Sequence, residues 1–180
     1  MTNPLTLYVM RHGQSNYNIL GLCNDDPDID VHLTDEGIKQ AEAAANELTQ
    51  VLFTRIYVSQ LPRTRQTAKI VNRHHNAPII TTPYLNDIRS GFEGRPVSEY
   101  FALTGHDRYN IVPRGGESVQ LFQQRVSKFL DEVKSIDDST ILVVTHEETM
   151  RVFYAYFNNL EPEEMMQLNF RNCEVISFTM

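Results

Sequence analysis

Short apolar runs alternate with amphipathic helical patterns along most of this chain, and this order constrains its fold more than any single motif does. The apolar runs are short enough to predict buried strands. Strands that alternate with helices predict an α/β fold in three layers, with a mainly parallel sheet and helices on both of its faces. The predicted strands are TLYVM (6–10), RIYVS (55–59), APIITT (77–82), ILVVT (141–145) and CEVISFTM (173–180).

The predicted helices show apolar residues three and four positions apart. They span residues 33–52, 63–75, 117–133 and about 149–158. The first has Thr34 as its N-cap, and acidic residues follow near the positive end of the helix dipole. Its apolar face is formed by Ile38, Ala41, Ala45, Leu48 and Leu52. The face of the third is formed by Val119, Phe122, Val126, Phe129 and Val133. Residues 91–116, rich in Gly, Pro, Arg and Tyr, predict a long excursion over one end of the sheet.

Length and composition indicate a single domain, 1–180, with a hydrophobic core of its own. No run approaches the roughly 20 apolar residues of a membrane span, and the N-terminus lacks the features of a secretory signal. We therefore expect a cytoplasmic protein with no membrane association. Cys23 and Cys173 form no CxxC pair and are expected to be reduced thiols, although the sequence leaves a disulfide between them open. The net charge of -7 argues against a broad nucleic-acid-binding surface. The oligomeric state is not specified by the sequence.

Three predicted strands are followed by arginine or histidine residues, which can bind anions or act as nucleophiles. TLYVM is followed by Arg11, His12 and Gly13, RIYVS leads to Arg63 at the start of a helix, and ILVVT is followed by His146. In open α/β sheets, ligands bind outside the carboxyl ends of the strands. We therefore expect two arginines and two histidines to converge at one edge of the sheet.

This combination favours a phosphoryl group as the ligand. Guanidinium groups match the oxygens of a phosphate and stay charged at any working pH. A neutral imidazole nitrogen is a competent nucleophile near neutral pH, and its attack on phosphorus would form a phosphohistidine that water then cleaves. Gly13 is expected to allow a tight turn and close approach of the phosphate to the backbone. A carboxylic acid must also protonate the leaving oxygen.

Six segments together resemble the histidine phosphatase superfamily, the phosphoglycerate mutase-like proteins. VMRHGQSNYN (9–18) resembles the motif RHG[E/Q][S/T]xxN of that family, and HLTDEGIKQA (32–41) resembles its PLTxxGxxQA segment. SQLPRTRQTA (59–68), LNDIRSGFEG (85–94) and PRGGESVQLFQQRV (113–126) are similar to its following motifs. VVTHEETMR (143–151) stands where V-S-H-G-G-x-I-R is usual. The matches run in order over most of the chain, and they imply a phosphoglycerate mutase-like fold.

The resemblance also implies roles for individual residues. His12 would be the phosphorylated nucleophile, and Asp87 falls on the position of the general acid. Arg11, Arg63 and His146 would hold the phosphate. The bound group would also contact Asn18 and Gln14. The resemblance implies no metal and no organic cofactor.

Three departures from the family pattern involve four positions. Asp87 stands where the mutase-like branch has Glu, and Thr64 replaces an Ala, a change that we expect to be neutral. Glu147 and Glu148 replace the usual Gly-Gly after His146. Another branch of the superfamily places its acid just after the second histidine, so Glu147 is the alternative proton donor and a further candidate for substrate contact.

We expect a phosphomonoesterase acting on a small phosphorylated metabolite. The alternatives are a phosphoglycerate mutase and a non-catalytic phosphate-binding or regulatory module. Family mutases are longer chains with a C-terminal tail over the site, and this sequence ends at SFTM, so hydrolysis is the expected reaction. Four arginines in or beside the covering segment are candidates for binding a second acidic group on the substrate, although most are expected to be solvated: Arg89, Arg95, Arg108 and Arg114.

Overall fold

A computed structural model describes residues 4–136 and 139–180 of the chain. Within these residues, the strands form one sheet in the order β3-β2-β4-β1-β5. Neighbours are parallel except for β5, which is antiparallel to β1. The mainly parallel sheet is therefore confirmed. The strand bounds are β1 Thr6–Arg11, β2 Arg55–Val58, β3 Ile79–Thr81, β4 Thr140–Thr145 and β5 Val175–Thr179.

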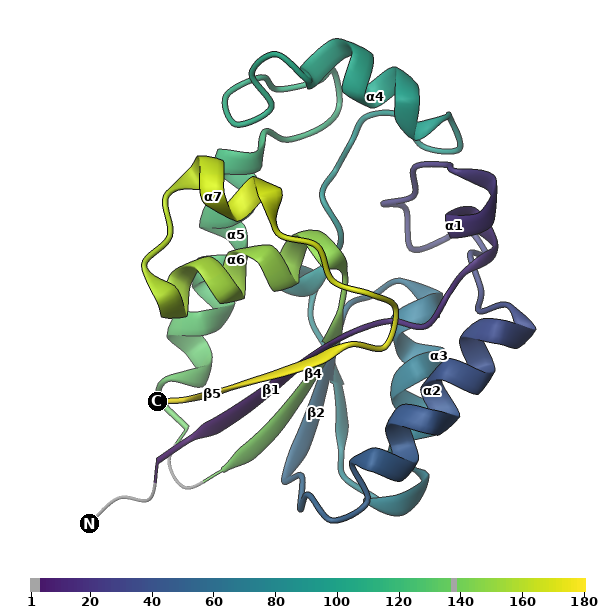
Figure 1. Ribbon diagram of the computed structural model, residues 1–180, viewed down its shortest axis with the longest axis vertical. Coiled ribbons are helices and arrows are strands. Elements are labelled where there is room, and N and C mark those ends of the chain that lie inside the picture. Colours follow the sequence, from purple (N-terminus) through teal and green to yellow (C-terminus); the bar gives the residue numbers. More distant parts are fainter. Residues whose placement is uncertain (1–3, 137–138) are drawn as a thin grey trace.

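Helices cover both faces of the sheet, which confirms the three-layer architecture (Figure 1). One face carries α2 (Asp35–Glu47) and α3 (Pro62–Val71). The other carries α5 (Val119–Val133), α6 (Glu147–Asn158) and α7 (Pro162–Gln167). Two shorter helices, α1 (Asn16–Leu20) and α4 (Val97–Thr104), lie beyond one end of the sheet (Figure 1). None of the helices in the described residues is both long enough and apolar enough to cross a membrane.

The central strand β4 separates two hydrophobic cores. Because successive side chains of a strand point to opposite faces, Ile141 and Val143 pack with α5 and α6, whereas Leu142 and Val144 pack with α2 and α3. The predicted apolar face of 117–133 is confirmed, since all five of its residues are buried. Two phenylalanines of α5, Phe122 and Phe129, are among the largest fully buried side chains.

The face predicted for residues 33–52 is only partly correct. Ala41, Ala45 and Leu48 are buried, but Ile38 is 38% exposed and Leu52 is 84% exposed. The helix ends at Glu47, so Leu52 lies beyond it and does not continue the apolar stripe. Small alanines form the buried face, which brings α2 close to its neighbours.

Other boundaries also differ from the prediction. The strand predicted at 77–82 is reduced to the three residues of β3, an exposed edge strand. Helix α6 begins at Glu147, two residues before the predicted start. The excursion at 91–116 contains the helix α4, and α1 and α7 were not predicted. These three helices are short, so each shows too few turns for a periodic pattern.

Candidate active site

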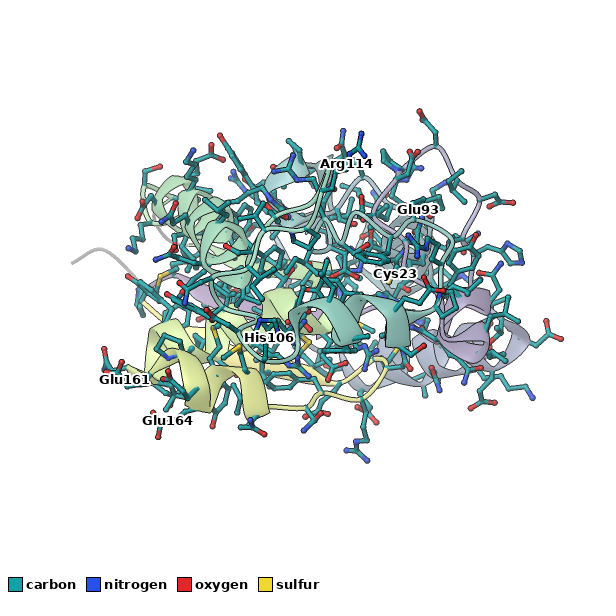
Figure 2. All side chains as sticks on the ribbon, turned by 90° about the horizontal axis from the view of Figure 1, so that it is seen from above. Cys23, Glu93, His106, Arg114, Glu161 and Glu164 are labelled. Carbon is teal, nitrogen blue, oxygen red and sulfur yellow. The ribbon has the colours of Figure 1, made fainter. Side chains whose placement is uncertain are left out.

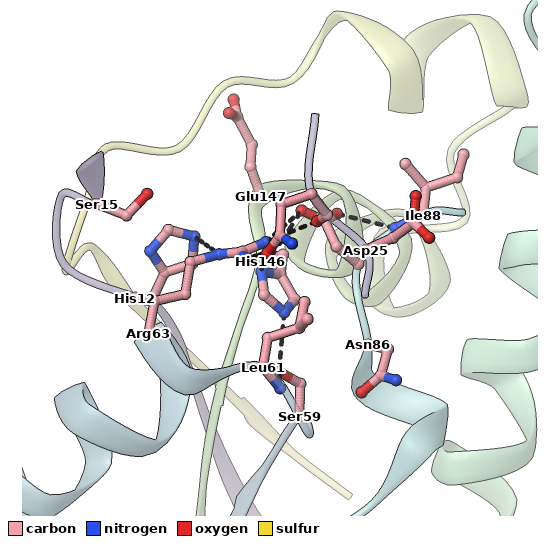
Figure 3. Close-up of polar contacts among 12 residues, drawn as sticks. His12, Ser15, Asp25, Ser59, Leu61, Arg63, Asn86, Ile88, His146 and Glu147 are labelled. Carbon is pink, nitrogen blue, oxygen red and sulfur yellow. Dashed lines mark hydrogen bonds and ion pairs between the residues drawn. The ribbon is translucent and has the colours of Figure 1, made fainter. Parts of the chain in front are cut away.

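The predicted strand ends meet at one edge of the sheet. Arg11 is the last residue of β1 and pairs in register with Thr145, the last residue of β4. His12 and His146 follow these two residues, and their ring centroids lie 5.2 Å apart. Arg63 lies in the first turn of α3, after β2. Figure 3 shows His12, Arg63 and His146 grouped together, as the sequence predicted.

The hydrogen bonds of His12 define its tautomer. Nδ1 lies 2.7 Å from the carbonyl oxygen of Gly13 and donates to it, since a carbonyl only accepts. Nε2 therefore carries the lone pair, and it accepts from Nε of Arg63 at 3.1 Å. Burial lowers the pKa of His12 well below its usual value of 6.5, and the charge of Arg63 lowers it further. His12 is thus a neutral imidazole with its Nε2 lone pair directed at a cation.

Arg63 is the centre of this cluster. Its side chain is 5% exposed, and it donates to His12, to both the side-chain and the backbone oxygen of Asn24, and to Asp87 at 3.2 Å. Its NH2 group also lies 3.3 Å from Nδ1 of His146. One buried guanidinium therefore links four side chains, and a shorter or non-planar cation would not reach them all.

His146 is supported from behind by hydroxyl groups. Its Nε2 lies 2.9 Å from Oγ of Ser59, and Ser59 Oγ lies 2.7 Å from Oγ1 of Thr64. Thr64, expected to be a neutral change, thus completes a buried chain of polar contacts. Burial, followed by the charge of Arg63, lowers the pKa of His146 well below 6.5. His146 lies beneath Arg63 and does not itself line the cavity.

Arg11 is held by the C-terminal segment and by Glu147. Its NH1 group donates to the carbonyl oxygen of Phe170 at 2.5 Å and lies 3.0 Å from Oε2 of Glu147. Its Nε is buried without a hydrogen-bond partner among the described residues. The segment also contacts the preceding turn, since the side chain of Asn172 donates to the carbonyl oxygen of His12. Arg11 lines the cavity.

The two candidate proton donors differ in their surroundings. Asp87 lies beside the cluster, 3.2 Å from Arg63 and 3.5 Å from Nδ1 of His146. Burial raises the pKa of Asp87 above its usual value, although the charge of Arg63 opposes this shift. Glu147 instead accepts from Arg151 and Phe170 and pairs with Arg11. Figure 3 shows its side chain extending away from the two histidines.

Asn18 and Gln14 are placed differently. Asn18 lines the cavity, and its Oδ1 accepts from the backbone N–H of Ser15 as part of a capping box. The side-chain oxygen of Gln14 accepts from Thr34 at 2.9 Å, and Gln14 does not line the cavity. The structure therefore brings Asn18 to the site and ties Gln14 to the start of α2.

Gly13 has a packing role that the sequence did not predict. A Cβ atom at Gly13 would lie 2.4 Å from the carbonyl oxygen of Gly37, in the first turn of α2. A Cβ atom at Gly37 would lie 2.0 Å from the carbonyl oxygen of Gln14. The glycine is thus required by close packing of the turn after β1 against α2. This packing also explains the glycine in the segment HLTDEGIKQA.

Sequence reasoning missed three supporting residues. Ser15 is buried against the cavity and caps α1, and Ser59 contacts His146. Asn24 holds Arg63 through two oxygens and donates to Glu93. Ser15 and Ser59 both lie within the quoted motifs and could have been found there. Asn24 lies in a polar loop without a periodic or motif signal.

The clustered residues open into a cavity of about 390 Å³. Arg11, His12, Arg63 and Asp87 form one end, and residues of α1, α4 and the start of α6 line the rest. Two arginines beside a neutral, lone-pair-bearing imidazole match a phosphoryl group that is attacked at phosphorus. Fold and site therefore define the class as phosphoryl-transfer proteins with a histidine nucleophile.

Comparison with known proteins identifies the family. The family model of the histidine phosphatase superfamily (branch 1) matches residues 7–180. The adenosylcobalamin/alpha-ribazole phosphatase of Salmonella typhimurium is 30% identical over 160 residues, covering 84% of this chain and 78% of that protein. The 2,3-bisphosphoglycerate-dependent phosphoglycerate mutase of Thermoplasma acidophilum is 29% identical over 174 residues, which cover 93% of this chain and 83% of that protein. The crystal structure of the alpha-ribazole phosphatase from Shigella flexneri superposes with a TM-score of 0.86 at 25% identity. The superposition covers 96% of this chain and 89% of that structure.

The chain therefore belongs to the histidine phosphatase superfamily, branch 1. The resemblance stated from the sequence motifs is confirmed. The activity class expected from it, a phosphomonoesterase working through a phosphohistidine, is confirmed at the level of the family.

Proposed function

We propose that this protein hydrolyses a phosphate monoester with Nε2 of His12 as the nucleophile. The observation that carries this proposal is the tautomer of His12, because its Nδ1 donates to Gly13 and leaves the Nε2 lone pair facing the arginine cluster. The lowered pKa of His12, caused by burial and Arg63, favours the same neutral form. A buried, neutral and oriented imidazole is ready to attack without losing a proton.

The first step transfers the phosphoryl group to the protein. Arg63 exchanges its bond to Nε2 for bonds to phosphate oxygens, and the guanidinium of Arg11, which lines the same cavity, donates to them as well. The Nε2–P bond forms as the bond from phosphorus to the leaving oxygen breaks. Asp87 gives its proton to that oxygen, so the alcohol departs neutral. The shift of Arg63 also brings its neighbour His146 within reach of the phosphate.

The second step releases phosphate. Water attacks phosphorus, the Nε2–P bond breaks, and the ionised Asp87 takes the proton of the water. Arg11 and Arg63 stabilise the charge on the phosphoryl oxygens in both steps. Such electrostatic stabilisation of the transition state is usually the largest single contribution to enzymatic rate enhancement. Their two positive charges also support our proposal that hydrolysis needs no metal, so activity should persist after dialysis against EDTA.

Asp87 is the proposed proton donor rather than Glu147. The pKa of Asp87 is raised, chiefly by burial, and its carboxyl lies against Arg63 and His146. Glu147 instead contacts two arginines and accepts from a backbone N–H. Its proposed role is to position Arg11 beside the phosphate.

The experiment that tests this function is rapid quenching with a phosphate-labelled substrate. We expect an acid-labile, alkali-stable label on His12, absent from His12→Ala and retained in His32→Ala, where an exposed histidine is removed. Label on a serine or an aspartate would overturn the mechanism. No label and no hydrolysis would instead favour a non-catalytic phosphate-binding module.

A mutase is the second candidate, because the relative from Thermoplasma acidophilum is a phosphoglycerate mutase. The two reactions share the phosphohistidine and differ in whether the phosphoryl group passes to water or to a second substrate molecule. We propose that hydrolysis dominates. Conversion of 3-phosphoglycerate to the 2-isomer faster than phosphate release would reverse this assignment.

The expected substrate is a small phosphorylated metabolite, in keeping with the name of the alpha-ribazole phosphatase relative. The volume of the cavity, about 390 Å³, is in the range of small-molecule sites. We also propose a cytoplasmic location, supported by the two free cysteines, Cys23 and Cys173. Fractionation of the native host with an antibody to the protein tests the location.

A further inference from the structure

The cavity has a second region, away from His12, that the reaction itself does not use. Helix α4 and the residues around α1 lie over this end of the sheet (Figure 1). Together with Ile88, which follows Asp87, they line the cavity with apolar and aromatic side chains: Tyr17, Leu22, Ile88, Val97, Tyr100 and Phe101. We call these six residues the apolar wall.

Phe101 is the most informative member of the apolar wall. It lines the cavity and yet is 44% exposed, so an aromatic ring faces solvent at the mouth of the site. The guanidinium of Arg108 lies 5.0 Å from its ring centroid and 5.6 Å from that of Tyr100. Tyr100 and Phe101 pack edge to face with their ring centroids 5.4 Å apart, so this part of the cavity offers aromatic contact to another ring.

The cations near the apolar wall are already paired. Arg108 and Arg151 both donate to Oε1 of Glu148, at 2.6 Å and 2.8 Å, and Arg151 also pairs with Glu147. Each of the two guanidinium side chains is only 11% exposed. A second anionic group on a substrate would therefore have to displace a carboxylate from a largely buried ion pair.

The other arginines of the covering segment do not reach the cavity. Arg89 pairs with Glu117 and Arg95 with Glu99, and neither lines the cavity. Arg114 is exposed and lies at the outer surface (Figure 2). Glu148 lines the cavity, and both Arg108 and Arg151 contact its Oε1, so within the described part of the chain its Oε2 is left as an acceptor.

We propose that the apolar wall and Glu148 together select the leaving group of the substrate. They favour the monophosphate of an uncharged alcohol that carries a flat ring, and they exclude substrates with a second anionic group. A hydroxyl or ring N–H on the leaving group would donate to Glu148. This inference rests on the proposed hydrolase function and adds the substrate class to it.

The test uses two substrates that differ in one distant charge. Benzyl phosphate and 4-carboxybenzyl phosphate have similar alkyl leaving groups, so the chemical step is matched. We expect kcat/KM for benzyl phosphate to be at least 100-fold higher, and also at least 10-fold higher than that for ethyl phosphate, which has no ring. Equal values for the two benzyl esters, or a preference for the carboxylate, would overturn the inference.

Variants connect the preference to the proposed residues. Phe101→Ala should lower the benzyl-to-ethyl ratio of kcat/KM about 10-fold, whereas Leu103→Ala should not change it. Leu103 is a matched control because it is also exposed on α4 but does not line the cavity. Glu148→Gln should raise kcat/KM for the 4-carboxybenzyl ester relative to the benzyl ester at least 10-fold. An unchanged ratio in both Phe101→Ala and Glu148→Gln would contradict the assignment.

Affinity measurements with non-hydrolysable ligands test this inference independently of the proposed hydrolase function. Benzylphosphonate and 4-carboxybenzylphosphonate cannot be hydrolysed, and calorimetry measures their affinities whether or not the protein is an enzyme. Tighter binding of the neutral compound supports the selective pocket even if no substrate is turned over. Similar affinities together with normal His12 labelling would leave the hydrolase intact and eliminate the selectivity.

Discussion

At the scale of single residues, the role of proton donor separates Asp87 from Glu147. Asp87→Asn removes the proton, so it should slow an alkyl phosphate by about 100- to 10,000-fold while sparing p-nitrophenyl phosphate, whose leaving group needs no proton. Glu147→Gln weakens the ion pair that holds Arg11, so it should slow both substrates by a similar, smaller factor. Steady-state kinetics on the two substrates measures both effects.

The opposite result for these two variants would reverse the assignment of the proton donor. A selective loss on the alkyl ester in Glu147→Gln, together with an equal loss on both esters in Asp87→Asn, would make Glu147 the donor. Circular dichroism on both variants verifies that the fold is retained, since both side chains are partly buried.

Arg63 offers a second prediction at this scale. Arg63→Lys keeps the charge but lacks the planar fork that contacts His12, Asn24 and Asp87 together. We expect kcat/KM to fall at least 100-fold, which corresponds to about 2.7 kcal/mol of lost transition-state stabilisation. Arg65→Lys is the matched control, because Arg65 lies on the same helix and is exposed. Near-normal kinetics in Arg63→Lys would mean that charge alone suffices.

At the scale of secondary-structure elements, periodic apolar patterns predicted the helices that are long and amphipathic. Helix α5 shows four turns of apolar residues facing one core, and its predicted face is buried throughout. Helix α4 has only eight residues, and apolar side chains lie on its exposed side as well, including Phe101 and Leu103. Its position depends on packing over the site, so its own sequence carries little periodic signal.

The contact between Gly13 and Gly37 was also beyond sequence reasoning. The sequence predicts a tight turn and close approach of a phosphate at Gly13, and the structure adds backbone of α2 packed against it. A lone sequence does not show which distant backbone lies within van der Waals distance of a glycine. The motif segments at 9–18 and 32–41 thus form one packed unit.

The packing of these two segments predicts the effect of Gly37→Ala. Alanine in a helix is ordinarily more favourable than glycine by about 0.5–1 kcal/mol. Here the added Cβ would meet a backbone oxygen at 2.0 Å, so we expect destabilisation of about 1–3 kcal/mol and reduced activity as the turn after β1 shifts. Gly115→Ala is the comparison, since its Cβ meets nothing within 4 Å and only its positive φ is strained. Urea denaturation of both variants measures the difference, and a more stable Gly37→Ala would refute the contact.

At the scale of the whole molecule, the site combines residues from distant parts of the chain. The convergence of Arg11, Arg63 and His146 was predictable, because each lies at or after the carboxyl end of a strand and parallel strands bring these ends to one edge of a sheet. The orientation of Glu147 was not, since it depends on Arg11, Arg151 and the C-terminal segment together. The sequence therefore predicted which residues gather and left open which of the carboxylates faces the histidines.

The two buried histidines should make the folded protein sensitive to acid. We propose that residues 1–180 unfold as one domain, so the free energy of unfolding describes the whole chain. The pKa values of His12 and His146 are lowered well below 6.5 in the folded state, chiefly by burial. Below pH 6.5 the unfolded chain thus binds protons that the folded protein does not. Stability should therefore be fully present above about pH 7.5 and fall as the pH drops toward 5.5.

Each histidine contributes a slope of up to about 1.4 kcal/mol per pH unit in this range. The raised pKa of Asp87 acts in the opposite direction, because the folded protein then holds a proton that the unfolded chain has lost. Urea denaturation between pH 7.5 and 5.5 measures the net slope, which His146→Asn should reduce because it removes one buried imidazole. His106→Asn is the control, since His106 is exposed (Figure 2) and should leave the slope unchanged. A slope that is the same in the wild type and in His146→Asn would show that this histidine does not stay neutral in the folded protein, and the proposed neutral cluster would then be wrong.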